Sequence, residues 1–367
     1  MKKVYFLLPI ITLVFLTIIS CKSDDDIGVT IIPPNDRGEQ AVVDQLIIEK
    51  YLETHFYNYE EFANPPANFD FNIVMDTIAG ENATKIPLID QVTSKTVKDR
   101  FEDDVTYKLY YLSALEGEGN TVAFPDICTI AYEGTSLYEK IVLSDIDENN
   151  DGVVDNNDLT EVYPTELFDA AVTPVRFDLT RVVNGFQDTM IEFRTATSGP
   201  MEQPDGTVTY SEDFGVGVMF IPSGLAYFSS GPAGSGIGAY NQLMFTFKLY
   251  QSEIGDQDDD TIISVMEDLN NNGFEEDDDT DEDGFPNYAD ADDDGDGTLT
   301  IDEILTQDYI VNITQGESEP TLASNEYEIE RVESVNSEGD DIVTITTITL
   351  TDTDDDGTPD YLDTDNS

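Results

Sequence analysis

Residues 217–227 read GVMFIPSGLAY, an apolar run closed by a proline and a Ser-Gly turn, and followed at once by Leu-Ala-Tyr. The run is rich in residues that suit a pleated, half-buried strand, and Pro222 cannot continue a central strand because it lacks a backbone N–H. The sequence therefore predicts a strand over 217–221 and a turn that presents Tyr227.

Similar runs lie on both sides of this stretch. They are rich in Val, Ile, Phe and Tyr, and Gly, Pro or Asp turns separate them, which is typical of an antiparallel sheet. The runs are Tyr107 to Leu112, Ile127 to Tyr132, Val175 to Leu179 and Leu243 to Tyr250. One short helix is expected near Asn184 to Phe193, so the sequence predicts an α+β fold in which a sheet wraps on that helix.

Several short motifs occur in the order found in the FK506-binding-protein (FKBP) family of peptidyl-prolyl isomerases, and the segment resembles that family over nearly all of residues 105–252. The motifs are Lys108-Leu109-Tyr110-Tyr111, Ile127 to Gly134 with its Tyr-x-Gly ending, Leu167-Phe168-Asp169, Phe177-Asp178-Leu179, Val182 to Phe186, Ile221 to Tyr227, Ile237, and Leu243-Met244-Phe245. The resemblance implies an FKBP-like antiparallel sheet and a prolyl isomerase that acts on proline-containing polypeptides.

The resemblance also implies a set of site residues. It assigns the floor and walls of an apolar proline socket to Tyr132, Phe168, Phe177, Val182, Val183, Phe186, Ile237 and Phe245, a hydrogen-bond donor to Tyr227, and a local charge to Asp169. The segment departs from the family pattern at four places. Phe186 stands where the family usually has Trp, Phe228 stands where it usually has Gly, Gly238-Ala239 replaces a proline pair, and the loop from Ser136 to Glu166 is enlarged.

The charge balance is the most unusual property of the composition. The 367 residues contain 78 Asp and Glu against 16 Lys and Arg, a formal net charge of -62. Such a surface repels phosphates, so nucleic-acid binding is excluded, and the carboxylates repel one another unless cations lie between them.

With two cysteines and a single histidine, His55, a disulfide framework, a Cys/His zinc site and a Ser-His-Asp triad are all implausible. We expect Cys128 to be buried and His55 to be an exposed helix residue.

Oxygen-bearing side chains recur at alternate positions ahead of glycines, which is the spacing of calcium loops. One loop lies inside an enlarged segment, 136–166, and the others lie in the acidic region 253–367, where they resemble EF-hand and thrombospondin type 3 loops. We predict structural Ca²⁺ and no catalytic cofactor. The candidate ligands are Asp147, Asn149, Asp151, Asp155, Asp158, Asp268, Asn270, Asn272, Asp279, Asp281, Asp283, Asp290, Asp292, Asp294, Asp296, Glu303, Asp352, Asp354, Asp356 and Asp363.

Residues 1–21 have two lysines, an apolar run and a closing Ser20-Cys21, which is the order of an export signal. The ending resembles the lipobox of bacterial lipoproteins, and Lys22-Ser23-Asp24-Asp25-Asp26 resembles the acidic export tag of Bacteroidetes surface lipoproteins. We therefore expect acylation at Cys21, a membrane anchor, and an outer-membrane lipoprotein on the cell surface or the periplasmic face. A spanning helix is the alternative.

The expected organisation has five parts: an export signal at 1–21, a tether at 22–40, a helical and mixed segment at 41–104, the FKBP-like domain at 105–252, and an acidic calcium-loop region at 253–367 with a hairpin over 326–350. The first interpretation of function is a prolyl isomerase that assists the folding of exported proteins. One alternative keeps the fold as a non-catalytic peptide-binding or gliding-associated lipoprotein. The other is a calcium-stiffened adhesin or structural protein.

Overall fold

The computed structural model describes residues 33–144, 146, 152–155 and 159–365. It divides into a unit of residues 1–34 and a unit of residues 35–367, and the second unit holds all the described helices and strands. No helix within these described residues is both long enough and apolar enough to span a membrane. The predicted lipidation site Cys21 lies outside the described residues.

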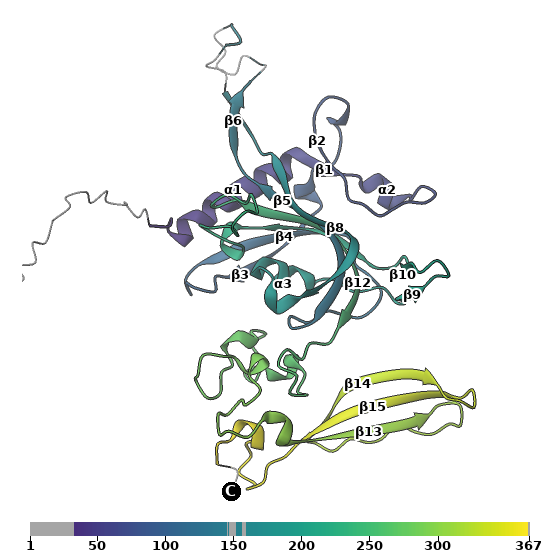
Figure 1. Cartoon of the computed structure of the whole chain (residues 1–367). Helices are drawn as coiled ribbons and strands as arrows, with labels where there is room; N and C mark the ends of the chain where they lie inside the picture. The colour runs from purple at the N-terminus through teal and green to yellow at the C-terminus, as the bar shows by residue number, and fades with distance from the viewer. Residues whose placement is uncertain (1–32, 145, 147–151, 156–158, 366–367) are drawn as a thin grey trace, which may run out of the picture. The chain divides into compact units, whose positions relative to one another are not determined.

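The central element is a six-stranded sheet in which every neighbouring pair is antiparallel, with strand order β3-β4-β11-β12-β5-β8. The strands are β3 (Thr93–Lys98), β4 (Thr106–Leu115), β5 (Ile127–Leu137), β8 (Thr165–Asp178), β11 (Gly215–Ile221) and β12 (Gln242–Glu253). The α+β class and the antiparallel sheet agree with the prediction (Figure 1). The sheet begins before residue 105, because β3 pairs with β4.

Helices cover both faces of this sheet. Alternate residues of one strand face opposite sides, and in β12 Leu243, Phe245 and Phe247 pack with the short helix α3 (Asn184–Met190), whereas Met244 packs with helix α1 (Arg37–Thr54). The two helices lie on either side of the strands in Figure 1. The sheet thus separates two apolar cores, and Cys128 is fully buried in the α3 core, as expected.

Small elements complete this part of the chain. They are β1 (His55–Tyr57), α2 (Tyr59–Ala63), β2 (Met75–Thr77), the 3-10 turns η1 (Gly80–Asn82), η2 (Leu88–Asp90), η3 (Leu179–Arg181) and η4 (Ser223–Leu225), β9 (Met201–Glu202) and β10 (Val208–Thr209). Helix α1 ends at Thr54, so His55 opens β1 and its side chain is partly buried, contrary to the expected exposed helix residue.

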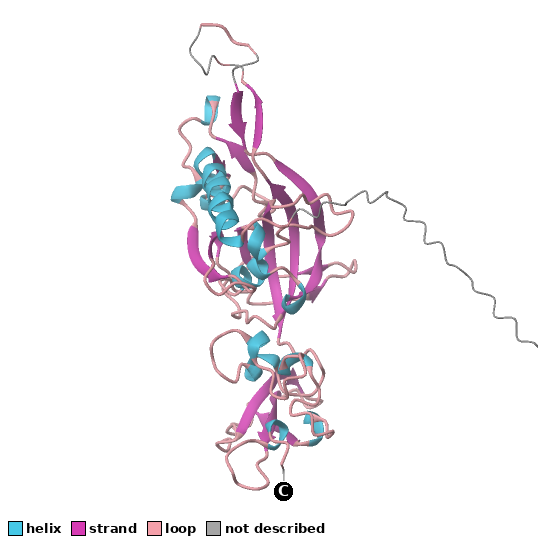
Figure 2. Ribbon diagram, turned by 90° about the vertical axis from the view of Figure 1, so that its left-hand side faces the viewer, coloured by secondary structure: helices cyan, strands magenta, loops and turns pink. Residues whose placement is uncertain are grey.

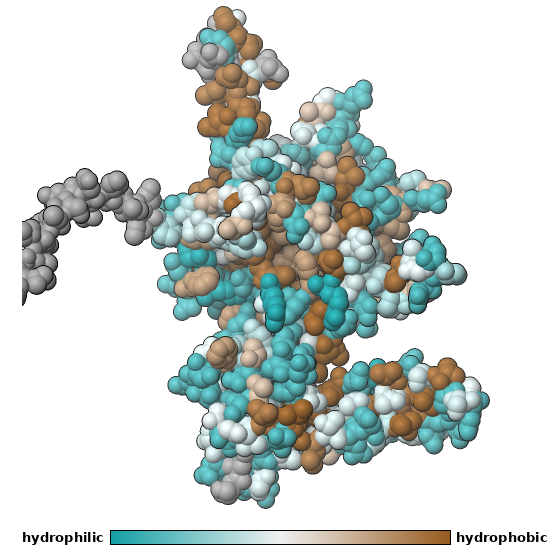
Figure 3. Space-filling model, viewed as in Figure 1, coloured by the Kyte–Doolittle hydropathy of each residue, from teal (hydrophilic) through white to brown (hydrophobic). Residues whose placement is uncertain are grey.

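The enlarged segment between β5 and β8 forms a projecting antiparallel hairpin, β6 (Lys140–Leu143) with β7 (Leu159–Val162). Its apolar side chains are unusually exposed: Ile141 is 62% and Leu143 is 59% exposed. Figure 3 shows this hairpin largely in the colour of hydrophobic residues.

The acidic region after β12 consists mostly of loops with short 3-10 turns, as Figure 2 shows. The turns are η5 (Ser264–Glu267), η6 (Glu275–Asp277), η7 (Asn287–Ala289), η8 (Thr300–Asp302) and, near the C-terminus, η9 (Asp360–Leu362). A three-stranded antiparallel sheet of order β13-β15-β14 lies between η8 and η9. Its strands are β13 (Ile304–Asn312), β14 (Glu326–Val335) and β15 (Asp341–Leu350), so the predicted hairpin is present and a further strand pairs with it.

Candidate functional site

Five aromatic rings gather on the α3 face of the six-stranded sheet. Phe186 from α3 and Phe245 from β12 are buried and meet edge to face, with ring centroids 5.2 Å apart. Phe168 lies 5.5 Å from Phe245, and Phe177 lies 5.6 Å from Phe186. Tyr132 lies 4.9 Å from Phe177. We call these five residues the aromatic cluster, and its three outer rings are only partly buried.

Strand geometry explains why these rings meet. Tyr132 in β5 pairs with Phe247 in β12, so its side chain leaves the sheet on the same face as that of Phe245, two residues along β12. Gly134 makes room for the rings, because a Cβ atom there would lie 2.7 Å from Cζ of Phe168 and 2.8 Å from Cε1 of Phe245. The packing of these rings therefore explains why the Tyr-x-Gly ending of the second predicted strand has glycine at residue 134.

Polar groups border the cluster on one side. The hydroxyl of Tyr132 donates a hydrogen bond to Oδ2 of Asp169 at 2.5 Å. Burial, together with this bond, raises the pKa of Tyr132, and burial with the nearby charge of Asp169 raises that of Tyr227. Because its pKa is raised, the Tyr227 hydroxyl stays protonated at neutral pH. Tyr227 is also 38% exposed, so it can donate a hydrogen bond to a ligand.

The remaining predicted socket residues also lie here. Val182, Val183 and Ile237 are partly buried and pack against the same core as the aromatic cluster. Val183 caps the N-terminus of α3, and its carbonyl accepts the backbone N–H of Phe186 at 2.8 Å. The structure thus brings the ten predicted residues to one face of the sheet, while their roles toward a substrate remain predictions.

Helix α1 contributes an arrangement that the sequence analysis did not anticipate. Asp44 is fully buried, and its Oδ2 accepts hydrogen bonds from the backbone N–H and the hydroxyl of Ser223, both at 2.7 Å. Its Oδ1 accepts from Nε2 of Gln242 at 2.9 Å and from Nε2 of Gln40 at 2.7 Å. Burial outweighs these bonds and raises the pKa of Asp44. Asp44 therefore links Ser223 and Gln242, which are the two ends of the segment that carries Tyr227.

Arg37 fixes the same segment from the start of α1. Its Nη2 donates to the carbonyl of Gly224 at 2.8 Å, and its guanidinium lies 4.3 Å from the ring centroid of Phe228. Phe228 has φ of 48°, a left-handed conformation that favours glycine. The Arg37 contact and the ring of Tyr240, 5.2 Å away, hold Phe228 in that conformation, which accounts for a bulky residue where the family usually has Gly.

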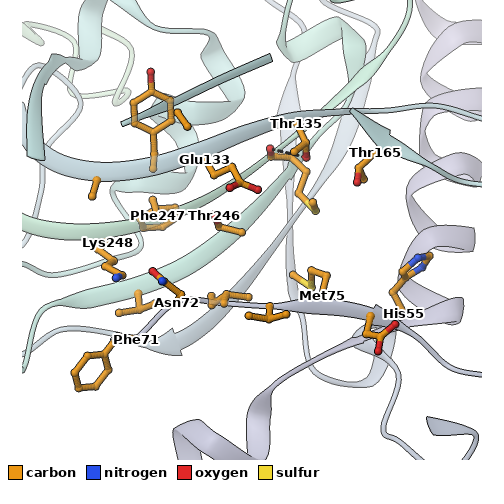
Figure 4. Close-up of a pocket in the computed structure, with 18 of the residues that line it drawn as sticks. His55, Phe71, Asn72, Met75, Glu133, Thr135, Thr165, Thr246, Phe247 and Lys248 are labelled. Carbon is orange, nitrogen blue, oxygen red and sulfur yellow. Dashed lines mark hydrogen bonds between the residues drawn. The ribbon is translucent and has the colours of Figure 1, made fainter. Parts of the chain in front are cut away.

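A cavity of about 730 Å³ lies on the opposite, α1 side of the sheet. It lies between residues 71–77 and strands β5, β8 and β12, and Figure 4 shows Glu133, Thr246, Lys248 and His55 on its walls. The His55 ring stacks on Tyr51 at 3.9 Å, and burial lowers the pKa of His55. The walls mix apolar and scattered polar groups, whereas the aromatic cluster concentrates apolar rings beside exposed donors. We therefore take the aromatic cluster as the candidate functional site.

Three of the predicted calcium loops bring carboxylates together, with ligand oxygens within 4.8 Å of one another. These groups are Asp279, Asp281 and Asp283; Asp292, Asp294 and Asp296; and Asp352, Asp354 and Asp356. Two of the loops abut, because a Cβ atom on Gly295 would lie 2.4 Å from Oδ2 of Asp281. Two other predicted ligands lie close to these groups. Burial and the nearby charges of Asp283 and Asp281 raise the pKa of Asp290. Burial and nearby charges, that of Asp363 among them, raise the pKa of Asp294.

The other predicted ligands are placed differently. Asn270 and Asn272 donate from their side-chain amide groups to Asp277, and Asp268 accepts the backbone N–H of Gly273. Glu303 caps the C-terminus of η8. In the loop at 147–158, Asp155 is described and exposed, whereas Asp147, Asn149, Asp151 and Asp158 lie outside the described residues.

Comparisons with known proteins give two kinds of similarity. Residues 257–321 match a family described as the BamM C-terminal domain. No curated protein matches the chain. Among solved structures, the chain is similar to a peptidyl-prolyl cis-trans isomerase from Pseudomonas syringae pv. tomato str. DC3000, with 15% identity and a TM-score of 0.26, over 43% of this chain and 80% of that one. It is also similar to FkpA from Escherichia coli, with 20% identity and a TM-score of 0.25, over 40% of this chain and 48% of that one.

Proposed function

We propose that the chain is an FKBP-like peptidyl-prolyl cis-trans isomerase of the cell envelope, and that the aromatic cluster receives the proline of an exported polypeptide. The observation that carries this proposal is the placement of half-buried Tyr132, Phe168 and Phe177 around buried Phe186 and Phe245, with Tyr227 exposed beside them. An apolar surface with a few convergent polar groups is typical of a ligand site.

The chemistry needs no nucleophile. Rotation about a prolyl amide is slow because the C–N bond has partial double-bond character. A dry aromatic surface accommodates the twisted amide, which has lost its resonance, better than the planar one, and such differential binding lowers the barrier. Tyr227 would donate a hydrogen bond to a substrate carbonyl, while Asp169, engaged with Tyr132, would set the local field.

Location and metal binding are part of the same proposal. The export signal and Cys21 support an outer-membrane lipoprotein, and the match of residues 257–321 to the BamM C-terminal domain is compatible with a cell-envelope location.

The three groups of carboxylates suit Ca²⁺, which prefers hard oxygen ligands. The ion would neutralise charges that otherwise repel one another within a loop, so its proposed role is structural.

The test is the isomerisation rate of a Xaa-Pro peptide by residues 22–367 in millimolar CaCl₂. Tyr227→Phe removes only the donor hydroxyl, and Phe177→Ala removes one half-buried ring. Phe285→Ala is the matched control, since Phe285 is 60% exposed and lies in the acidic region. We expect acceleration by the wild type and the control, and at least a tenfold loss in Phe177→Ala. A folded wild type that binds the peptide without accelerating exchange would instead establish the non-catalytic peptide-binding alternative.

A further inference from the structure

Five carboxylates come together just after β12, four of them outside the predicted calcium loops and one, Asp293, inside the Asp292 loop. They form two groups of three, each with ligand oxygens within 4.8 Å of one another, and the groups share one residue. The first group is Asp256, Asp258 and Asp260, and the second is Asp260, Glu267 and Asp293. We call these five residues the junction cluster.

Three residues of the junction cluster are almost fully buried. Asp260 and Glu267 are each 1% exposed, and Asp293 is 2% exposed. Both carboxylate oxygens of Glu267, both of Asp293, and Oδ2 of Asp260 are buried without a hydrogen-bond partner. None of the ion pairs found in the described part of the chain involves these residues.

Such an arrangement is costly unless a positive group lies inside it. A buried carboxylate without a partner carries a large desolvation penalty, and several of them repel one another. The buried oxygens of Glu267 and Asp293, close to an oxygen of Asp260, therefore favour a cation between them.

The spacing within the chain agrees with this interpretation. Asp256, Asp258, Asp260 and Glu267 occupy positions 1, 3, 5 and 12 of a twelve-residue loop, and a glutamate at position 12 is the bidentate ligand of EF-hand loops. Position 6, normally Gly, is Thr261, and its φ of 88° is the left-handed conformation that the glycine would supply. The missing glycine is why the sequence analysis did not recognise this loop.

The backbone of this loop follows the same pattern as the predicted calcium loops. The N–H of Thr261 donates to Oδ2 of Asp256 at 3.3 Å, as that of Gly284 donates to Asp279 at 3.0 Å. The N–H of Ile262 donates to Oδ1 of Asp260 at 2.7 Å, as that of Phe285 donates to Asp283 at 2.9 Å. The loop therefore has the local fold of its neighbours without their glycine.

We propose that the junction cluster is a Ca²⁺ site, centred on Asp260, Glu267 and Asp293 and completed by Asp256 and Asp258. Two oxygens that both lie 2.3–2.6 Å from one Ca²⁺ are at most about 5 Å apart, which agrees with the spacing within each group. One oxygen from each aspartate and two from Glu267 supply about six ligands, within the 6–8 that Ca²⁺ takes and with little room for the waters that Mg²⁺ usually keeps.

The proposed site lies where three separate segments of the chain meet, so a bound ion would stabilise their contact. Gln257, inside the loop, donates from Nε2 to the carbonyl of Pro125 and accepts the hydroxyl of Ser264 at 2.6 Å. A Cβ atom on Gly255 would lie 2.0 Å from the same Pro125 carbonyl oxygen, so the loop backbone lies directly against residue 125. Asp293 belongs to the Asp292 loop, farther along the chain. The ion would therefore join the end of β12, the residues before β5 and the Asp292 loop.

The test counts calcium ions in residues 22–367 by isothermal titration after removal of metal, with native mass spectrometry as a second count. Glu267→Gln and Asp258→Asn each remove one ligand charge, and Asp258 is only partly buried, so its variant is the safer one for folding. Glu282→Gln is the matched control, because Glu282 is exposed and occupies a non-ligand position of the Asp279 loop. Circular dichroism verifies that each variant is folded.

We expect both junction variants to bind at least one ion fewer than the control, or to bind one ion at least tenfold more weakly. Melting in chelator provides an independent readout. Because Glu267→Gln removes a buried charge that nothing else compensates, it should raise the melting temperature in chelator and diminish the rise caused by calcium. Calcium stoichiometry and affinity equal to those of the wild type in the folded Asp258→Asn variant, with an unchanged calcium-dependent melting shift, would overturn the proposal. Neither readout depends on isomerase activity.

Discussion

The contact between Arg37 and the segment that carries Tyr227 leads to a quantitative prediction. Arg37→Ala removes an ion pair with Asp99, whose side chain is fully buried, at an Nε to Oδ2 distance of 2.5 Å. It also removes the hydrogen bond to Gly224 and the cation–π contact with Phe228. The variant leaves the Asp99 carboxylate with its other partners only, namely the hydroxyl of Tyr107 and the backbone N–H groups of Phe101 and Glu102.

The expected loss of stability follows from the burial of that carboxylate. Burial opposes the ionisation of Asp99, whereas hydrogen bonds from Tyr107 and Phe101, together with Arg37, hold the pKa of Asp99 below its ordinary value. Removing one partner of a buried pair costs about 3–5 kcal/mol, and the remaining donors favour the lower end. We therefore expect Arg37→Ala to lower the free energy of unfolding by about 3 kcal/mol.

Urea unfolding in millimolar CaCl₂ measures this difference. Arg37→Lys keeps the charge but loses the planar stacking on Phe228, so it should cost about 1–2 kcal/mol. The control is Arg176→Ala, whose ion pair with Glu253 is exposed on both sides and should be worth less than about 1 kcal/mol. Binding of a proline peptide should weaken in Arg37→Ala, because the Tyr227 segment loses its support.

Two outcomes would contradict this reasoning. If Arg37→Ala costs no more than Arg176→Ala, the buried ion pair does not stabilise the fold. If Arg37→Ala lowers stability as expected while peptide affinity is unchanged in the folded variant, α1 does not position the Tyr227 segment.

Three further predictions concern the packing, the pH dependence and the charge of the molecule. Gly134→Ala places a Cβ atom 2.7 Å from Cζ of Phe168, so it should cost about 1–3 kcal/mol and lower the melting temperature; an unchanged melting temperature would show that the rings move freely. Burial raises the pKa of Asp126 to about 6, so its contribution to stability is complete below pH 4 and is lost as the pH rises through 6. Asp126→Asn should therefore remove about 3 kcal/mol of that pH-dependent decrease, measured by urea unfolding between pH 4 and 7, and parallel curves for the two proteins would argue against it. In chelator, 0.5 M NaCl should recover only part of the melting temperature that 5 mM CaCl₂ recovers, since salt screens repulsion whereas calcium is ligated; equal recovery by the two salts would indicate screening alone.

Local patterns predicted the strands of the central sheet, for a physical reason. Short runs of residues that suit a pleated surface, separated by turn residues, indicate where strands lie. The grouping of Tyr132 with Phe245 came from the resemblance to the FKBP family, and the pairing of Tyr132 with Phe247 places both side chains on one face. The sheet could not be delimited in this way: β3, with a single buried residue, Val97, carries little periodic signal and joins the sheet by pairing with β4.

Contacts between distant segments were beyond the reach of local patterns. Arg37 and Gly224 are separated by 187 positions, and Asp44 and Ser223 by 179, so no spacing rule connects them. The junction cluster was missed for a different reason. Its ligands have the expected spacing, but the glycine that usually identifies such a loop is replaced by Thr261, and Asp293 comes from another loop.

The hydrogen bonds of Asp44 also have a consequence for the order in which the molecule is assembled. Helix α1 is synthesised before Ser223 and Gln242, yet within the described residues the hydrogen bonds of its buried Asp44 carboxylate come from those two residues and from Gln40. Until the chain beyond residue 242 has emerged, the sheet that α1 covers lacks β12, and contacts so distant in sequence form slowly. The segment carrying Tyr227 therefore acquires its final shape only late in folding, and an incomplete or truncated chain would expose α1 to other polypeptides.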